Sequence, residues 1–307
     1  MANPTLAIET RLLRKEYGHT VAVRGLTLDV RRGEVFGFLG PNGAGKTTSI
    51  KMFLGLASPT GGEGYLLGKP LGDLPVRAKV GFLPEHFRFH DWLTGMEFLT
   101  LHGQLQHVPE NTLRARREQL LELVGLTPFA GSQLRTYSKG MLQRIGLAQA
   151  LINQPELIFL DEPTSGLDPV GRRLVRDIIR GLRERGATVF LNSHFLSEVE
   201  ITCDRVAFIK NGEVVRTSEL KHLIDGRTTL TIRARGLTPG MVSTLSQWGQ
   251  DVRQDGEHVS LVVKSDEVLP EITRYLVEEG AQVYAVVPQR ASLEELFIET
   301  VGTEGVL

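Results

Sequence analysis

The stretch of residues 40–48 constrains this chain more than any other part of its sequence. It follows the apolar run Val35–Leu39 and precedes residues 49–54, which have a helical pattern. A buried strand, a glycine-rich loop and a helix in this order are typical of a phosphate-binding loop. Small residues let successive backbone N–H groups face an anion, and the helix N-terminus adds partial positive charge. The predicted site consists of Gly40, Pro41, Asn42, Gly43, Ala44, Gly45, Lys46, Thr47 and Thr48.

Two side chains of this loop suit a nucleoside triphosphate with its magnesium ion. The ammonium group of Lys46 can reach the β- and γ-phosphates, and the hydroxyl group of Thr47 can bind Mg²⁺. We therefore expect Lys46 to take part in catalysis as well as binding, and Thr47 to be a metal ligand.

Two further apolar runs end in residues that suit the same chemistry. Residues 157–160 are followed by Asp161 and Glu162, and residues 188–191 by Asn192, Ser193 and His194. Ligands of α/β sheets bind at the carboxyl ends of strands, so Asp161, Glu162 and His194 are predicted to lie near the loop. Asp161 is predicted to hold Mg²⁺, Glu162 to polarise the attacking water, and His194 to contact the γ-phosphate. The alternative for Asp161 and Glu162 is a solvated helix start, and the alternative for His194 is a purely structural role.

Composition narrows the classes of protein and of binding partner that remain possible. The 307 residues contain 35 basic and 36 acidic side chains, so charge gives no reason to expect a nucleic acid partner. Cys203 is the one cysteine, which excludes an internal disulfide and suits a reducing cytoplasm. The charged N-terminal residues do not resemble a signal peptide, and no apolar run approaches the about 20 residues of a membrane span. A membrane, if one is involved, must come with another chain.

The patterns favour an α/β domain over residues 1–226 and a small α+β domain over residues 227–307. In the second part, strand and helix patterns follow the order β-α-β-β-α-β plus a final helix, which is compatible with a ferredoxin-like module. Near the N-terminus, residues 5–14 and 21–30 are predicted strands joined by a turn at Tyr17. That ring could stack on a purine or cover a hydrophobic edge.

Three further local patterns give predictions. Residues 58–64 are rich in turn-forming residues and are predicted to form a turn. Residues 205–210 and 213–215 are predicted to form a hairpin around Asn211 and Gly212. Residues 239–248 are predicted to form a helix.

Residues 5–224 resemble the nucleotide-binding subunits of ABC transporters, with every motif in order. Residues 40–48 are similar to the Walker A motif, 157–162 to Walker B, 165–168 to the D-loop and 193–194 to the H-loop. Residues 137–144 occupy the signature position but carry Lys139 and Met141 in place of glycine and glutamine. Glu85 stands where most members have the Q-loop glutamine. The Leu-Pro-Glu there and the C-terminal extension resemble the ABC-2 export branch.

The resemblance implies a P-loop ATPase fold with a RecA-like core, an antiparallel β subdomain and a helical subdomain. It implies ATP and Mg²⁺ as ligands, and a pair of subunits, expected to be a homodimer, that enclose two ATP molecules. Ser138 and Gly140 would bind the γ-phosphate across that dimer. Tyr17 would stack on adenine, and Glu85 and Asp168 would lie at the nucleotide.

The resemblance also implies a separate membrane permease, reached from the cytoplasmic face, and a hydrolysis cycle coupled to export. Residues 86–92, with Phe87, Phe89 and Trp92, are the predicted contact for that permease; a buried aromatic cluster is the alternative. The competing function is a soluble ABC ATPase of iron–sulfur assembly, repair or regulatory type. Metal binding by His86 and His90 would require a third ligand that the segment does not supply.

Overall fold

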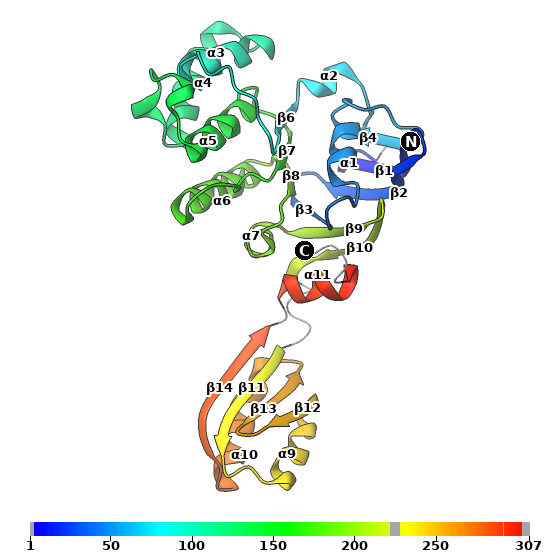
Figure 1. The fold of residues 1–307 in the computed structure, drawn as a ribbon, viewed down its shortest axis with the longest axis vertical. Helices are drawn as coiled ribbons and strands as arrows, with labels where there is room; N and C mark the ends of the chain where they lie inside the picture. The colour runs from blue at the N-terminus through cyan, green and yellow to red at the C-terminus, as the bar shows by residue number, and fades with distance from the viewer. Residues whose placement is uncertain (1–2, 222–227, 291, 303–307) are drawn as a thin grey trace. The chain divides into compact units, whose positions relative to one another are not determined.

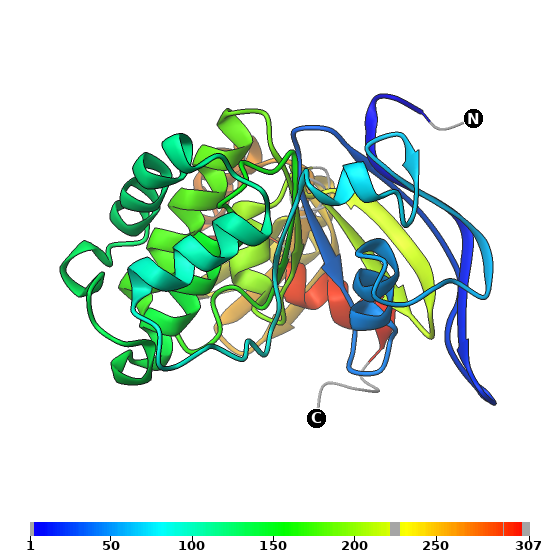
Figure 2. The ribbon, with the colours of Figure 1, turned by 90° about the horizontal axis from the view of Figure 1, so that it is seen from above.

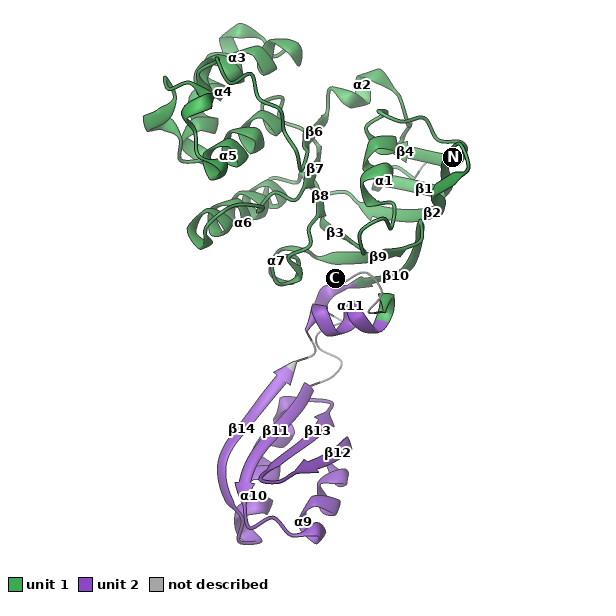
Figure 3. Ribbon diagram, viewed as in Figure 1, with its two compact units in different colours: residues 1–218, 300–307 green, residues 219–299 purple. Residues whose placement is uncertain are grey.

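The computed structural model describes residues 3–221, 228–290 and 292–302 of the chain. It divides into two units, which Figure 3 colours separately: Met1–Ser218 with Thr300–Leu307, and Glu219–Glu299. The boundary expected at residue 226 lies outside the described residues and stays a prediction.

A six-stranded sheet forms the centre of the first unit, in the order β10-β9-β3-β8-β7-β6. The pairs β3–β8, β3–β9, β6–β7 and β7–β8 are parallel. All residues of β3, β7 and β8 are buried, as expected for strands covered on both faces. The strands are β3 (Val35–Leu39), β6 (Val80–Leu83), β7 (Leu157–Asp161), β8 (Thr188–Asn192), β9 (Arg205–Lys210) and β10 (Glu213–Glu219).

Helices cover both faces of this sheet. Helix α1 lies on one side, and α5 and α6 lie on the other, as both views of the ribbon show (Figures 1 and 2). Helix α1 begins at Lys46, earlier than the sequence pattern indicated, because Gly45 already turns the chain into the helix. The helices are α1 (Lys46–Phe53), α3 (Gly95–Leu105), α4 (Glu110–Leu123), α5 (Lys139–Ala150), α6 (Pro169–Glu184) and α7 (Leu196–Thr202).

An antiparallel sheet, β2-β1-β4-β5, lies beside α1 and packs into the same core cluster. The turn predicted over residues 58–64 is wrong for residues 61–64, which belong to strand β4 and pair with β1: Ile8 lies opposite Leu66, Arg11 opposite Glu63 and Arg14 opposite Gly61. Glycine has a low β propensity, and the segment forms a strand because β1 and β5 supply its hydrogen-bonding partners. The elements are β1 (Leu6–Tyr17), β2 (Thr20–Arg31), β4 (Gly61–Leu66), β5 (Lys69–Pro70) and α2 (Leu74–Arg77).

The turn between β9 and β10 is the predicted one. Asn211 and Gly212 have φ angles of 52° and 77°, and a two-residue hairpin of this kind requires positive φ at both positions. A Cβ atom at position 212 would lie 2.6 Å from the backbone nitrogen of Arg24, so only glycine fits. The hairpin prediction is confirmed.

The second unit contains a four-stranded antiparallel sheet in the order β12-β13-β11-β14. Numbered by sequence within the unit, this is the order 2-3-1-4 of a split βαβ arrangement, and the predicted ferredoxin-like element order is confirmed. The predicted helix over residues 239–248 is shorter, because a 3₁₀ turn (Leu245–Gln247) replaces its end. The elements are β11 (Thr228–Arg235), α9 (Pro239–Thr244), β12 (Gly249–Asp255), β13 (His258–Val263), α10 (Leu269–Glu278), β14 (Gln282–Arg290) and α11 (Leu293–Val301).

Both outer strands of this sheet are irregular. The register of β12 shifts between Gln250 and Arg253, where Asp251 has a φ of 55°. The register of β14 shifts between the partners of Arg233 and Ala234, and Pro288, which has no N–H group, lies opposite Leu230. No helix in the described part of the chain has the length and apolar composition needed to cross a membrane.

Candidate functional site

The loop between β3 and α1 is shaped by glycines that cannot be replaced. A Cβ atom on Gly40 would lie 2.4 Å from the carbonyl oxygen of Ile209, and one on Gly45 would lie 2.6 Å from that of Ala22. Gly45 also has a φ of 102°, which strongly favours glycine. The loop therefore bends tightly against the core and leads directly into the first turn of α1.

The start of α1 presents groups that attract an anion. No side chain caps this end, and the first N–H groups of a helix have no partners within it. The Nζ atom of Lys46 lies 2.6 Å from the carbonyl oxygen of Gly40 and 3.1 Å from that of Pro41, so the ammonium group lies over the loop. Burial lowers the pKa of Lys46, and the nearby charges of Glu162, Asp161 and Glu85 oppose that shift.

Asp161 ends β7 and is buried. Its Oδ1 accepts a hydrogen bond from Nδ2 of Asn192, the last residue of the neighbouring strand β8. Burial raises the pKa of Asp161, and the Asn192 hydrogen bond opposes this. The Oδ1 atom of Asn192 and the hydroxyl oxygen of Thr164 are also buried, and neither has a hydrogen-bond partner in the protein. Unpartnered buried oxygens of this kind are normally satisfied by water or a ligand.

Glu162 follows with an unusual backbone. Its φ is 54°, and its N–H donates to the carbonyl oxygen of Asn192 at 2.8 Å. The side chain is buried, and its Oε2 lies 2.7 Å from Nδ1 of His194. Burial raises the pKa of Glu162, while its hydrogen bond with His194 and the histidine's charge act in the opposite direction. A carboxylate with a raised pKa held by a histidine suits a general base.

The structure brings further predicted residues to this place. The side chains of Lys46, Asp161 and Glu162 lie close enough for their charges to shift one another's pKa. The charge of the exposed Glu85, after β6, acts to raise the pKa of both Lys46 and Asp161. The histidine ring is largely exposed and packs on Phe195 with ring centroids 4.1 Å apart. The first-turn hydroxyls of α1, the Asp161 carboxylate and the Asn192 amide oxygen are the hard oxygen donors that Mg²⁺ prefers.

Other predicted residues lie elsewhere. Ser138 caps α5 by accepting from the N–H of Met141 at 3.2 Å, and Asp168 caps α6 by accepting from the N–H of Gly171 at 2.7 Å. A Cβ atom on Gly140 would lie 3.3 Å from Leu167. Helices α1 and α5 lie on opposite faces of the sheet (Figure 1). The predicted residues therefore form two groups, one at the P-loop and one at the signature loop.

Tyr17 ends β1 and is half-exposed, with the Nζ atom of Lys15 4.8 Å from its ring centroid. Stacking on adenine stays a prediction for this ring. Cys203 is buried, and burial raises the pKa of its thiol well above the usual value, as expected for a packed residue.

Sequence reasoning missed two residues of the site. Asn192 contacts both carboxylate residues, and Nε2 of Gln143 donates to the carbonyl oxygen of Glu162 at 3.0 Å. A polar residue at the end of an otherwise apolar buried strand is a signal that could have identified Asn192. Nothing in the sequence pattern identifies the contact of Gln143, which depends on how α5 packs.

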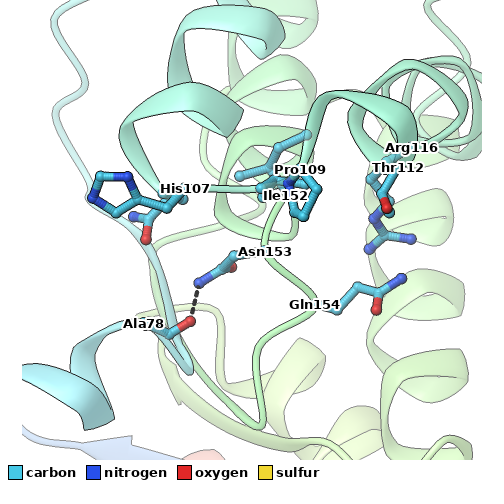
Figure 4. Close-up of a pocket in the computed structure, with 10 residues that line it drawn as sticks. Ala78, His107, Pro109, Thr112, Arg116, Ile152, Asn153 and Gln154 are labelled. Atoms are coloured by element: carbon cyan, nitrogen blue, oxygen red, sulfur yellow. Dashed lines mark hydrogen bonds between the residues drawn. The ribbon is translucent and has the colours of Figure 1, made fainter.

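A surface cavity of about 230 Å³ lies apart from these groups. Figure 4 shows it between the segment from His107 to Arg116 and the segment from Ile152 to Gln154. None of the predicted site residues lines it, so it lies apart from the predicted phosphate site. Within residues 3–221, 228–290 and 292–302, no three His, Cys, Asp or Glu side chains gather as a metal-binding group.

Comparison with known proteins gives the family. Residues 23–165 match the family described as ABC transporter, and residues 216–301 match the C-terminal domain of DrrA1-3-like ATP-binding proteins. An uncharacterized ABC transporter ATP-binding protein of Nostoc sp. is 42% identical over 310 residues, covering 97% of this chain and 91% of the relative. This chain belongs to the ABC transporter ATP-binding proteins.

Members of this family with named roles are also similar. The daunorubicin resistance ATP-binding protein DrrA3 of Streptomyces coeruleorubidus is 37% identical, and the match covers 94% of each chain. Among solved structures, the ATP-binding subunit of an ABC transporter gives a TM-score of 0.66 at 31% identity, covering 71% of this chain and 92% of that one. The expected P-loop ABC ATPase fold is confirmed.

The dimeric ATP-binding cassette MJ0796, solved in a post-hydrolysis state with ADP and Pi, gives a TM-score of 0.64 at 28% identity, covering 69% of this chain and 98% of that one. ABC ATP-binding domains bind and hydrolyse ATP, and this chain is an ATPase of that family. Its relatives and its DrrA-like C-terminal domain assign it to the ABC-2 type ATPase subunits.

Proposed function

We propose that two copies of this chain enclose two ATP molecules and drive a separate membrane permease that exports its cargo. The observation that supports this most is the division of the site residues. Lys46, Asp161, Glu162 and His194 gather at the P-loop, whereas the signature residues around Ser138 belong to a helix on the opposite face of the sheet. A second subunit is then needed to bring a signature loop to each nucleotide.

Each residue of the P-loop group has a role in the proposed reaction. The loop N–H groups and Lys46 bind the β- and γ-phosphates. Glu162 accepts a proton from the attacking water, and His194 holds that carboxylate through the 2.7 Å contact between Nδ1 and Oε2. Thr47 and Asp161 would hold Mg²⁺, which neutralises charge on the phosphates. Asn192 fixes Asp161, and its free Oδ1 is suited to a water molecule there.

The permease contact is proposed at residues 86–92. Phe87 and Phe89 are half-buried and pack against each other and against the buried Phe98, with centroids 4.4 to 5.9 Å apart, so part of this segment belongs to an aromatic cluster. Trp92 differs, because 65% of its surface is exposed. An exposed tryptophan beside a rigid aromatic cluster suits a protein partner. The inward phenylalanines would support the segment while Trp92 makes the contact.

Export is favoured over import by the relatives. They include the linearmycin resistance ATP-binding protein LnrL of Bacillus subtilis and the Nod factor export ATP-binding protein I of Ralstonia nicotianae. With a permease as partner, the chain would be a peripheral protein at the cytoplasmic face of the membrane.

The test is capture of partners with tagged Glu162→Gln protein from detergent-solubilised host membranes in the presence of ATP. The substitution is intended to stop the cycle in its ATP-bound state. Recovery of a polytopic membrane protein, identified by mass spectrometry and absent with Lys46→Ala protein, is the expected result. Reproducible recovery of soluble partners alone, with the dimer intact, would instead favour a soluble ABC ATPase.

A further inference from the structure

Helix α5 joins two places that matter to the proposed reaction. Its N-cap is Ser138 of the signature loop, and five residues later Gln143 reaches the peptide of Glu162. The Nε2 atom of Gln143 lies 3.0 Å from the Glu162 carbonyl oxygen. The helix runs from Lys139 to Ala150, so both contacts lie within its first two turns. A displacement of the signature loop is therefore transmitted directly to Gln143.

The peptide that Gln143 contacts is a strained one. A non-glycine residue in the left-handed region costs about 1–3 kcal/mol and persists only where its surroundings hold it. At Glu162 the N–H donates to Asn192, and the carbonyl oxygen accepts from the N–H of Ser165 at 3.1 Å and from Gln143. Asn192 is on the sheet and Ser165 is three residues away. Gln143 provides the contact from the signature helix.

We propose that Gln143 is a positioning residue that couples the signature loop to the Glu162 carboxylate of the same chain. The inference rests on the proposed dimer, in which the signature loop of one chain meets the ATP held by the other. Engagement of that ATP sets α5, and Gln143 then fixes the direction of the Glu162 side chain towards the chain's own ATP. Occupation of one composite site thereby prepares the base of the other.

The experiment compares three variants of the full-length chain. Gln143→Leu removes the donor at similar volume, and Gln143→Glu places a carboxylate against the carbonyl oxygen. Gln149→Leu is the matched control, because Gln149 is on the same helix and its buried Oε1 has no protein partner. Turnover is measured against ATP concentration, ATP affinity with a fluorescent nucleotide, and folding by thermal melting.

Wild-type protein should show cooperative hydrolysis, with a Hill coefficient approaching about 2, the number of sites. Gln143→Leu should lower turnover by about tenfold to a hundredfold, as misplacement of a catalytic group does, and bring the Hill coefficient towards about 1. Gln143→Glu should lower turnover further. ATP affinity should change by less than about twofold in both Gln143 variants, because Gln143 does not bind the nucleotide in this proposal. Gln149→Leu should match wild type in turnover, cooperativity and affinity, because in this proposal Gln149 contacts neither the nucleotide nor Glu162.

Unchanged turnover and cooperativity in Gln143→Leu would overturn the proposal. So would parallel losses of turnover and melting temperature in Gln143→Leu and Gln149→Leu, since that result indicates a general role of α5 in stability. Failure of the proposed function is distinguishable: Glu162→Gln protein would then form no dimer with ATP. A dimer that forms normally, with Gln143→Leu still cooperative, rejects the coupling alone.

Discussion

The central sheet of the first unit and the sheet of the second unit differ in where they bury polar groups. In the first, β7 and β8 end side by side in Asp161, Glu162 and Asn192, all of them buried. In the second, Thr228 is the one buried polar residue among those that the structure describes. Its interior is otherwise apolar, with Leu230, Ile232 and their neighbours fully covered.

The difference follows from strand direction. Parallel strands place their carboxyl ends at one edge, so polar residues from several strands meet there and can act on one ligand. Antiparallel strands alternate their ends, so no comparable cluster arises. At the edge of the first sheet, burial raises the pKa of Asp161 and Glu162, and Glu162 has a left-handed backbone. The second sheet packs a mainly apolar interior.

The largest expected effect is at Glu162. Glu162→Gln should lower ATP turnover by about a hundredfold to ten-thousandfold, because an amide cannot accept the proton of water. ATP binding should remain. Steady-state phosphate release measures the first and equilibrium titration the second. Glu257→Gln is the matched change in the second unit, where it removes an exposed ion pair with Arg235. Equal losses in both variants would remove the contrast between the sheets.

Ile232→Ala should lower the stability of the second unit and leave ATP binding and hydrolysis unchanged. This β11 side chain is fully buried, and its truncation should cost about 2–5 kcal/mol of unfolding free energy. Ile232→Val should cost about 0.5–1.5 kcal/mol. Calorimetry measures both. If ATP affinity fell in step with stability, the two sheets would not be separable in function.

Lys46→Ala should weaken ATP binding by about tenfold to a hundredfold, because hydrogen bonds to charged groups contribute about 1.5–3 kcal/mol. Lys51→Ala, on the exposed side of the same helix, should leave affinity unchanged. Isothermal titration calorimetry gives both constants. Matching affinities for wild type and Lys46→Ala would refute the assignment of the loop.

The smallest effect is a shift with pH. Burial raises the pKa of Glu162, so the acidic limb of kcat/KM should lie above the usual range of a glutamate. Turnover falls as pH drops through that pKa, because the protonated acid is no base. His194→Ala removes the hydrogen bond and charge that lower this pKa, so the limb should move to higher pH. A limb that moved to lower pH would contradict the role of His194.

Much of this site could be predicted from sequence, because it depends on local patterns. The run Val35–Leu39 before the glycines and the run before Asp161 gave the strands, and the positions of Lys46 and Glu162 followed. Asn211 and Gly212 gave the hairpin, since few residues tolerate positive φ.

What could not be predicted depends on packing between distant segments. Strand β4 has the composition of a turn and forms only because β1 pairs with it. The left-handed backbone of Glu162 and its contact with Gln143 require β8 and α5 to be in place. Likewise, nothing in the sequence separates the inward Phe87 and Phe89 from the exposed Trp92.

The irregular outer strands of the second unit have a consequence for the newly made chain. A straight outer strand offers a row of free N–H and C=O groups on which another molecule can add its own strand. The register shifts in β12 and β14, together with Pro288, break that row on both sides. Addition of a strand from another molecule along β12 or β14 is therefore disfavoured as soon as this sheet has formed.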